Sequence, residues 1–232
     1  MLKKIKYLKY YFGVLLRNWL RKKETYSQHG EDKLVESIIG SKRILSYIDI
    51  GANDGVLFSN TYKFARRGAR GICLEPSRSC YLKLKLNHLF NFQTKCIQIA
   101  ISNDESIMFL KEDGYENVLS MVSPNKTSNS YAVKSTSLVD LLKRFPKFGS
   151  PELVSIDVEG FEEKVIQGAG DSLLKSKIII LEVDKSSLKK ILCLPALRDH
   201  YPAYSNGINL FLLNRKCRYE RPKRLPEGFY QC

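Results

Sequence analysis

Acidic and small residues follow several short apolar runs of this sequence, at the point where each run ends. The run at 44–50 (ILSYIDI) contains Asp49 and leads into Gly51 and Gly55, and the next apolar run is followed by Glu75. Two glycines after a strand permit a tight turn and the close approach of a ligand to the backbone, and an acid at the end of the next strand can bind ribose hydroxyls. Each feature alone is also typical of a turn or a helix cap. Together they predict a pocket for a nucleoside cofactor.

The loop GANDGV at 51–56 indicates which cofactor this pocket takes. NAD-binding loops carry GxGxxG, so that backbone N–H groups and a helix dipole meet a pyrophosphate. Here Asn53 and Val56 stand at the middle and last glycine positions, and Asp49 and Asp54 add negative charge where a pyrophosphate would lie. An acidic loop suits a cofactor with an amino acid and a sulfonium cation, which predicts S-adenosylmethionine.

The elements that must position these residues alternate as in βα units. Nearly continuous Ile, Val and Leu in the strands predicts a parallel sheet that is covered on both faces. The stretch at 203–213 contains Ser-Asn-Gly and predicts a terminal antiparallel hairpin. Residues 102–136 interrupt the alternation with the stretch SIMFLKED, a polar turn and a loop at 123–130 rich in Ser, Asn and Thr. We expect this insertion to form a substrate cover. The expected strands are 44–50, 70–74, 94–101, 152–158 and 177–183, and the expected helices are 30–39, 57–67, 77–90, 137–144 and 160–175.

Four stretches resemble the FkbM family of S-adenosylmethionine-dependent methyltransferases. They are SQHGEDKLV at 27–35, YIDIGANDGVLFSNTY at 47–62, CLEP at 73–76 and VSIDVEGFEEKVIQGA at 154–169. The resemblance implies a Rossmann-like class I methyltransferase fold with a mostly parallel seven-stranded sheet, a C-terminal antiparallel hairpin and helices on both faces. We expect this domain at 26–213, between a basic N-terminal helix at 1–25 and a basic tail at 214–232.

The resemblance also implies the residues that bind the cofactor and the reaction. The expected reaction is methyl transfer to a hydroxyl group, often of a sugar or a related natural product. The 51–55 loop would surround the methionine part, Glu75 the ribose, and Asp157 would face the methyl group. The full expected cofactor-binding set is Asp49, Gly51, Ala52, Asn53, Gly55, Glu75, Pro76, Ile101, Ser102 and Asp157.

Transfer to a hydroxyl group requires a base within hydrogen-bonding reach. Asp157 is the first candidate, although it could instead anchor the ammonium group of the cofactor. Glu159 could serve as base or cap the helix that follows it, and His29 could serve as base or follow an N-cap at Ser27. The remaining candidate is Glu182. It could also hold a divalent cation together with Asp157 and Asp184, but this alternative is not favoured and no metal site is assigned.

The charge of the chain is concentrated at its ends. The net charge is +14, of which residues 1–23 carry +8 and residues 214–232 carry +4, so the body is nearly neutral. Nucleic acid is therefore not the expected partner. Residues 1–23 place apolar side chains at helical spacing among the lysines and arginines, which is typical of a helix lying on an anionic membrane surface. A helix packed on the protein itself is the alternative.

Cysteine and histidine spacing argues against a structural zinc site. The six cysteines form no CxxC pair and the three histidines form no HxxxH motif. We expect reduced thiols and a cytoplasmic protein, peripheral to the inner face of the membrane if the N-terminal helix binds there.

Two other classes of function remain open from the sequence. One is a nicotinamide-dependent oxidoreductase on a similar sheet, which the missing GxGxxG disfavours. The other is a non-catalytic binding module with the same fold.

Overall fold

The computed structural model describes residue 20, residues 23–113 and residues 119–232. The expected N-terminal helix at 1–25 therefore lies outside the described residues except for Leu20 and residues 23–25. Among the described residues, no helix combines the length and the apolar character needed to cross a membrane.

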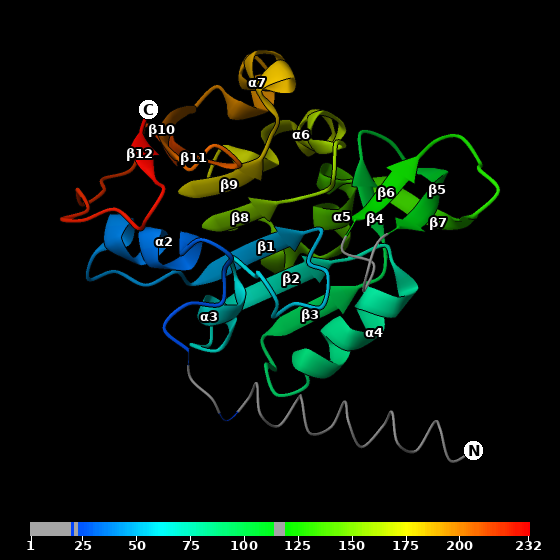
Figure 1. Cartoon of the computed structure of the whole chain (residues 1–232), viewed down its shortest axis with the longest axis horizontal. Helices are drawn as coiled ribbons and strands as arrows, with labels where there is room; N and C mark the ends of the chain where they lie inside the picture. The colour runs from blue at the N-terminus through cyan, green and yellow to red at the C-terminus, as the bar shows by residue number, and fades with distance from the viewer. Residues whose placement is uncertain (1–19, 21–22, 114–118) are drawn as a thin grey trace.

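The main sheet has eight strands and is parallel over most of its width (Figure 1). The parallel strands lie in the order β3, β2, β1, β8, β9, and the antiparallel strands β11, β10 and β12 continue the sheet. This arrangement confirms the predicted parallel sheet with a terminal hairpin. The eighth strand, which was not predicted, is a two-residue pairing of the C-terminal tail with β10. The bounds are β1 (Ser46–Ile50), β2 (Arg70–Leu74), β3 (Thr94–Ile97), β8 (Leu153–Ile156), β9 (Ile178–Glu182), β10 (His200–Ser205), β11 (Asn209–Asn214) and β12 (Tyr230–Gln231).

Helices cover both faces of this sheet and enclose one apolar core on each. Successive side chains of a strand point to opposite faces, so β1 sends Ile48 and Ile50 into one core and Tyr47 into the other. The first core lies under α5 (Leu138–Arg144), α6 (Glu162–Ala169) and α7 (Lys185–Leu192), and the second lies under α2 (Glu31–Ile39), α3 (Tyr62–Ala65) and α4 (Arg78–Asn87). Short 3-10 turns at Pro146–Phe148, Gly170–Leu173 and Pro195–Leu197 complete the first layer.

Two expectations for local structure are wrong. The helix expected at 57–67 is reduced to the four residues of α3, because Ser59 accepts hydrogen bonds from the N–H groups of residues 61 and 62 and holds the preceding segment as a turn. The strand expected at 94–101 splits into β3 and β4 (Ala100–Ser102), which belong to different sheets. The described part of the region 102–136 is largely strand, which was not predicted from the sequence.

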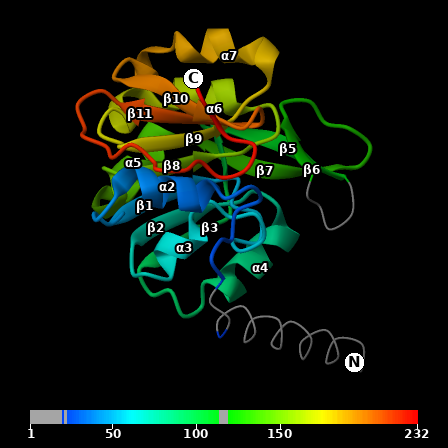
Figure 2. The same ribbon diagram turned by 60° about the vertical axis from the view of Figure 1, so that its left-hand side comes forward.

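That region forms a second sheet of four strands, in the order β4, β7, β5, β6. It contains β5 (Ser106–Asp113), β6 (Leu119–Ser123) and β7 (Ser130–Ser137). Met108, Leu110 and Val133 form its own small core. Figures 1 and 2 show this sheet beside the ends of the parallel strands, where it contributes Val122 to the cavity described below.

Candidate functional site

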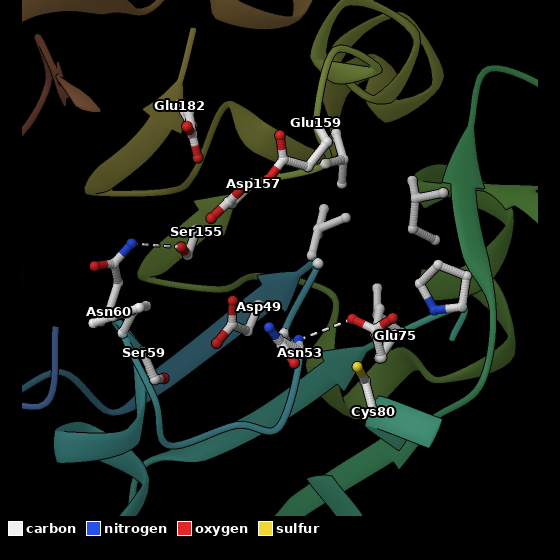
Figure 3. Close-up of a pocket in the computed structure, with 18 of the residues that line it drawn as sticks. Asp49, Asn53, Ser59, Asn60, Glu75, Cys80, Ser155, Asp157, Glu159 and Glu182 are labelled. Atoms are coloured by element: carbon white, nitrogen blue, oxygen red, sulfur yellow. Dashed lines mark hydrogen bonds between the residues drawn. The ribbon is translucent and has the colours of Figure 1, made fainter. Parts of the chain in front are cut away.

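A cavity of about 290 Å³ lies at the carboxyl ends of β1, β2, β8 and β9 (Figure 3). Parallel strands bring their carboxyl ends to the same edge of a sheet, which is where open α/β sheets bind ligands. This volume is near the lower end of small-molecule pockets, which hold roughly 300 to 1,000 Å³. The cavity is therefore large enough for a small organic ligand.

The loop after β1 is shaped by hydrogen bonds to the neighbouring strand. The N–H groups of Gly51 and Ala52 both donate to the carbonyl oxygen of Leu74, at 3.0 and 3.1 Å. Gly51 has φ of +83°, and a Cβ atom there would lie 1.7 Å from the carbonyl oxygen of Asp157. Only glycine fits this close crossing of the segments that follow β1 and β8.

Glu75 is buried at the end of β2 and holds two backbone segments together. Its Oε2 accepts a hydrogen bond from the N–H of Asn53 at 2.8 Å, and its Oε1 accepts one from the N–H of Ser77 at 2.8 Å. The side chain is 6% exposed. Glu75 thus fixes the 51–53 loop at the end of β2, beside the cavity.

Asp49 is buried on the floor of the cavity. Its Oδ2 accepts a hydrogen bond from Thr61 Oγ1 at 2.6 Å. Burial raises the pKa of Asp49 to about 6, and the hydrogen bonds from Thr61 and Ser59 offset part of this rise. This carboxyl group therefore changes its charge close to neutral pH.

Asp157, Glu159 and Glu182 form an acidic group at the ends of β8 and β9 (Figure 3). Burial raises the pKa of Asp157 well above its usual value, and the neighbouring Glu182 carboxyl raises it further. Burial followed by repulsion from Glu182 also raises the pKa of Glu159. Because burial and nearby like charge disfavour the ionised form, the Asp157 carboxyl group binds a proton more readily than an ordinary aspartate.

All charged side chains that line the cavity among the described residues are acidic. They are Glu31, Asp49, Glu75, Asp157, Glu159 and Glu182. No lysine, arginine or histidine of the described chain joins them, although the protein carries a net charge of +14. The cavity is therefore built to attract a cation and to repel an anion.

A second polar group lies on the side of the cavity near α2 and the β10–β11 turn. Glu31 is fully buried, and its Oε1 accepts hydrogen bonds from Asn209 Nδ2 at 2.9 Å and from Asn206 Nδ2 at 3.1 Å. Its Oε2 accepts one from the N–H of His29 at 2.8 Å. These bonds hold Asn209 at the wall of the cavity. Further along that wall, Asn60 Nδ2 donates to Ser155 Oγ at 3.1 Å.

Sequence reasoning did not identify this second group. The Glu31 side chain is held by asparagines about 175 residues away in the sequence, so no local pattern points to it.

The backbone conformation of three residues also indicates a functional site at the cavity. Among the described residues, the three non-glycine residues with positive φ are Asn53, Phe58 and Glu159, and all three line the cavity. Such conformations cost of order 1 to 3 kcal/mol and concentrate at functional sites.

The structure places most of the predicted site residues at the cavity. Asp49, Gly51, Ala52, Asn53, Glu75, Pro76, Ile101, Asp157, Glu159 and Glu182 line it. Three predicted residues do not line it: His29, Gly55 and Ser102. Gly55 lies against Leu84 and His88 of the α4 region, Ser102 is buried with its hydroxyl donating to Asn103, and His29 contributes its backbone N–H to Glu31.

The alternative roles considered for the acids are also resolved by geometry. Glu159 does not cap a helix: α6 begins at Glu162, whose carboxylate accepts from the N–H groups of Val158 and Gly160. Asp184 caps α7 by accepting from the N–H groups of residues 186 and 187. Hydrogen bonds from Ser186 and Ser187 lower the pKa of Asp184 to about 2. Within the described residues no three His, Cys, Asp or Glu side chains are grouped to hold a metal ion.

Comparisons with known proteins identify similar sequences and folds. The model of the methyltransferase FkbM domain matches residues 49–220. The crystal structure of a methyltransferase FkbM from Methylobacillus flagellatus superposes with a TM-score of 0.50 at 12% identity, over 87% of this chain and 58% of that one. This chain thus spans a little over half of that structure, and at this identity the likeness concerns the fold alone.

Two further structures are similar at lower scores. An O-methyltransferase from Bacillus cereus in complex with SAH gives a TM-score of 0.45 at 12% identity, over 89% of this chain and 88% of that one. A precorrin-6y C5,15-methyltransferase from Geobacter metallireducens gives 0.43 at 12% identity, over 83% and 89% of the two chains. No curated protein matches the sequence.

Proposed function

Because this chain belongs to the FkbM methyltransferase family, we propose that it transfers the methyl group of S-adenosylmethionine to a hydroxyl group of a sugar or glycan. The observation that carries the proposal is the uniformly acidic lining of the cavity in a strongly basic chain. S-adenosylmethionine has a sulfonium and an ammonium cation, which six carboxylates attract. The pyrophosphate of a nicotinamide cofactor would be repelled there, which argues against an oxidoreductase.

The residues present fit this cofactor. Gly51 lets the backbone come close to a ligand, and Glu75 ends the second strand, where a carboxylate binds ribose hydroxyls in folds of this kind. Ile99, Ile101 and Pro76 supply an apolar wall for an adenine ring. When bound, S-adenosylmethionine supplies an activated methyl group on a sulfonium leaving group.

The Asp157 and Glu182 pair would accept the proton of the acceptor hydroxyl. A carboxylate with a raised pKa is a better base near neutral pH than an ordinary one. Burial and the proximity of the two acids raise the pKa of Asp157, as described above. Asp157 in its ionised form would take the proton, and Glu182 lies beside it at the end of the next strand.

The acceptor class is inferred from the polar wall near α2. Gln28, Asn60 and Asn209 line the cavity beside the acidic group. Amide and carboxylate groups together donate and accept hydrogen bonds, which suits an acceptor with several hydroxyl groups. Residues 1–23 would hold the protein at an anionic membrane surface on the cytoplasmic side, where a lipid-linked saccharide could be reached.

Thermal unfolding with S-adenosylhomocysteine tests the cofactor. At about 100 times its dissociation constant the ligand should add roughly 2.7 kcal/mol, or about 5 to 11 °C in melting temperature for a chain of this size. We expect Glu75→Gln to reduce the shift. Glu105→Gln is the matched control, because Glu105 pairs with Arg144 on the exposed surface away from the cavity. NAD should give no shift, and a shift with NAD alone would favour the oxidoreductase.

Methyl transfer to sugars tests the acceptor. The full chain would be incubated with S-adenosylmethionine and a panel of oligosaccharides, and the products analysed by mass spectrometry for a gain of one methyl group. Transfer to an amino group or a carbon atom instead would contradict the acceptor class. Binding of the cofactor without transfer to any member of the panel, together with unchanged cellular activity of Glu75→Gln, would favour a non-catalytic binding module.

A further inference from the structure

Helix α4 carries apolar side chains on two opposite faces. Cys80 and Leu84 are buried and face the sheet. Leu82 and Leu86, on the other side of the helix, are 55% and 42% exposed, and Leu89 just beyond its end is 54% exposed. A surface helix normally places polar residues on its outer side. The exposed leucines of α4 do not pack in the core of this protein, which indicates that they have another role.

The exposed apolar residues form one continuous surface. Leu82, Leu86 and Leu89 are spaced four and three residues apart, which places them on one side of a helix. The loop to β3 follows directly and contains Phe92, which is 89% exposed. We call these four residues, together with Phe90, the α4 face. Clustered exposed apolar side chains of this kind mark an interaction surface, whereas single ones do not.

The segment of the sequence that carries the α4 face contains basic residues and no acid. From residue 76 to residue 103 there is no Asp or Glu, and the basic residues are Arg78, Lys83, Lys85 and Lys95. Lys95 lies over the ring of Phe145, on the face of the sheet that α5 covers, so it is not part of the surroundings of the α4 face. The other three belong to α4, and none of them forms an ion pair within the described part of the chain. Arg78, Lys83 and Lys85 can therefore meet negative charge from outside.

Tyr26, three residues after the basic segment 1–23 of the sequence, lies close to the end of α4. Tyr26 packs edge to face on Tyr62 at 4.9 Å, and Tyr62 packs in the same way on His88 at 5.3 Å. His88 is the C-cap residue of α4. Tyr26 is therefore two ring contacts away from the end of this helix. Figures 1 and 2 show α3 and α4 on the same side of the main sheet.

We propose that the α4 face binds an anionic lipid bilayer, with the leucines and phenylalanines inserted at the level of the headgroups and Arg78, Lys83 and Lys85 on lipid phosphates. Apolar side chains combined with Lys and Arg are the pattern of interfacial membrane binding. A second copy of the chain would bring these three cations against three others, which opposes self-association through this face. The surface is separate from residues 1–23 and does not depend on the chemistry of the cavity.

The same helix also reaches the cavity. Cys80, in the first turn of α4, lines the cavity, while the outer side of the helix forms the α4 face. A bilayer bound at this face would hold the cavity at a fixed distance from the lipid headgroups. Residues 1–23 alone, as a tether, would not fix the orientation of the body.

Co-sedimentation of the full chain with lipid vesicles tests the proposal. Vesicles of phosphatidylcholine with phosphatidylglycerol would be compared with vesicles of phosphatidylcholine alone. We expect Phe92→Ser to lower partitioning to the anionic vesicles about tenfold, because a buried phenylalanine is lost. We expect Lys83→Glu to lower it by at least about fivefold, through loss of one cation at the surface. Ile107→Ser is the matched control, because Ile107 is 66% exposed on β5, away from the α4 face.

Each outcome decides for or against the α4 face. Reduced partitioning of both variants with an unchanged control supports it. Partitioning equal to wild type in both variants overturns it and assigns any membrane binding to residues 1–23. Wild-type protein that binds no vesicle, or that forms a dimer in light scattering which Phe92→Ser abolishes, also overturns it. Melting temperatures with S-adenosylhomocysteine check that each variant is folded.

Discussion

The cavity and the α4 face lie on opposite sides of one helix and use charge in opposite ways. The cavity collects six carboxylates and no cation of the described chain, whereas the α4 face is flanked by Arg78, Lys83 and Lys85 and its sequence segment contains no acid. Three of the acids are buried and three are half-buried, and burial raises the pKa of Asp49, Asp157 and Glu159. The cations stand in water, where repulsion is weak. The acidic group should therefore be sensitive to pH and to single substitutions, whereas the exposed basic group should tolerate both.

The largest expected effect concerns the proposed base in the cavity. Asp157→Asn should lower the rate of methyl transfer about 10² to 10⁴-fold, since an amide cannot accept the proton. Vesicle partitioning should be unchanged, which separates the cavity from the α4 face. The measurement is kcat with saturating acceptor, beside Glu182→Gln. A Glu182→Gln variant that loses more activity than Asp157→Asn would move the role of base to Glu182.

Two glycines with similar φ angles allow the cost of backbone strain to be compared with the cost of a steric clash at the cavity. Gly51 and Gly68 have φ of +83° and +85°, but only at Gly51 would a Cβ meet other atoms. Gly68→Ala should cost about 1 to 2 kcal/mol in free energy of unfolding, from the left-handed backbone alone. Gly51→Ala should cost more, because the new Cβ displaces the Asp157 carbonyl, and it should abolish the thermal shift with S-adenosylhomocysteine. Urea unfolding of both variants checks this, and equal costs would contradict the close crossing.

The buried acids should make stability depend on pH. The pKa of Asp49 is about 6 in the folded protein, above the usual 3.8. The folded state therefore holds this proton more tightly than the unfolded state, and stability should fall as pH rises from about 4 to about 6. The contribution of Asp49 is on the order of 2 to 3 kcal/mol. Asp49→Asn should flatten the profile of unfolding free energy against pH, whereas the exposed control Glu105→Gln should retain it. A slope retained in Asp49→Asn would assign the proton uptake to Asp157 alone.

The smallest expected effect is that of the α4 face on the cavity. Phe92→Ser and Lys83→Glu should each change the free energy of S-adenosylhomocysteine binding by less than about 0.5 kcal/mol, because exposed substitutions far from a site have little effect. Isothermal titration calorimetry without lipid measures this. A larger change would mean that the outer side of α4 and its cavity side are coupled, and the two regions could no longer be treated as independent.

The strand ends explain how much of the site could be predicted. A buried parallel strand has a nearly continuous apolar sequence, so the acids that follow each strand stood out, and parallel pairing brings those ends together. Asp49, Glu75, Asp157 and Glu182 were found in this way, and all line the cavity. Gly55 and Ser102 were close in sequence to such positions and His29 preceded the first predicted helix, but none of the three lines the cavity. Proximity in sequence does not determine which way a loop residue points.

The sequence by itself determined the βα order, the parallel sheet with its terminal hairpin, the family and the acids at the strand ends. It did so because these features depend on local pattern: runs of apolar residues, glycines in a turn and motifs within single segments. Only the tertiary structure decided that region 102–136 contributes to a second sheet, that Glu31 is held by Asn206 and Asn209, and that the leucines on the outer side of α4 are exposed among the described residues. These depend on contacts between segments far apart in the chain. No local pattern records which residues such contacts bury and which they leave exposed.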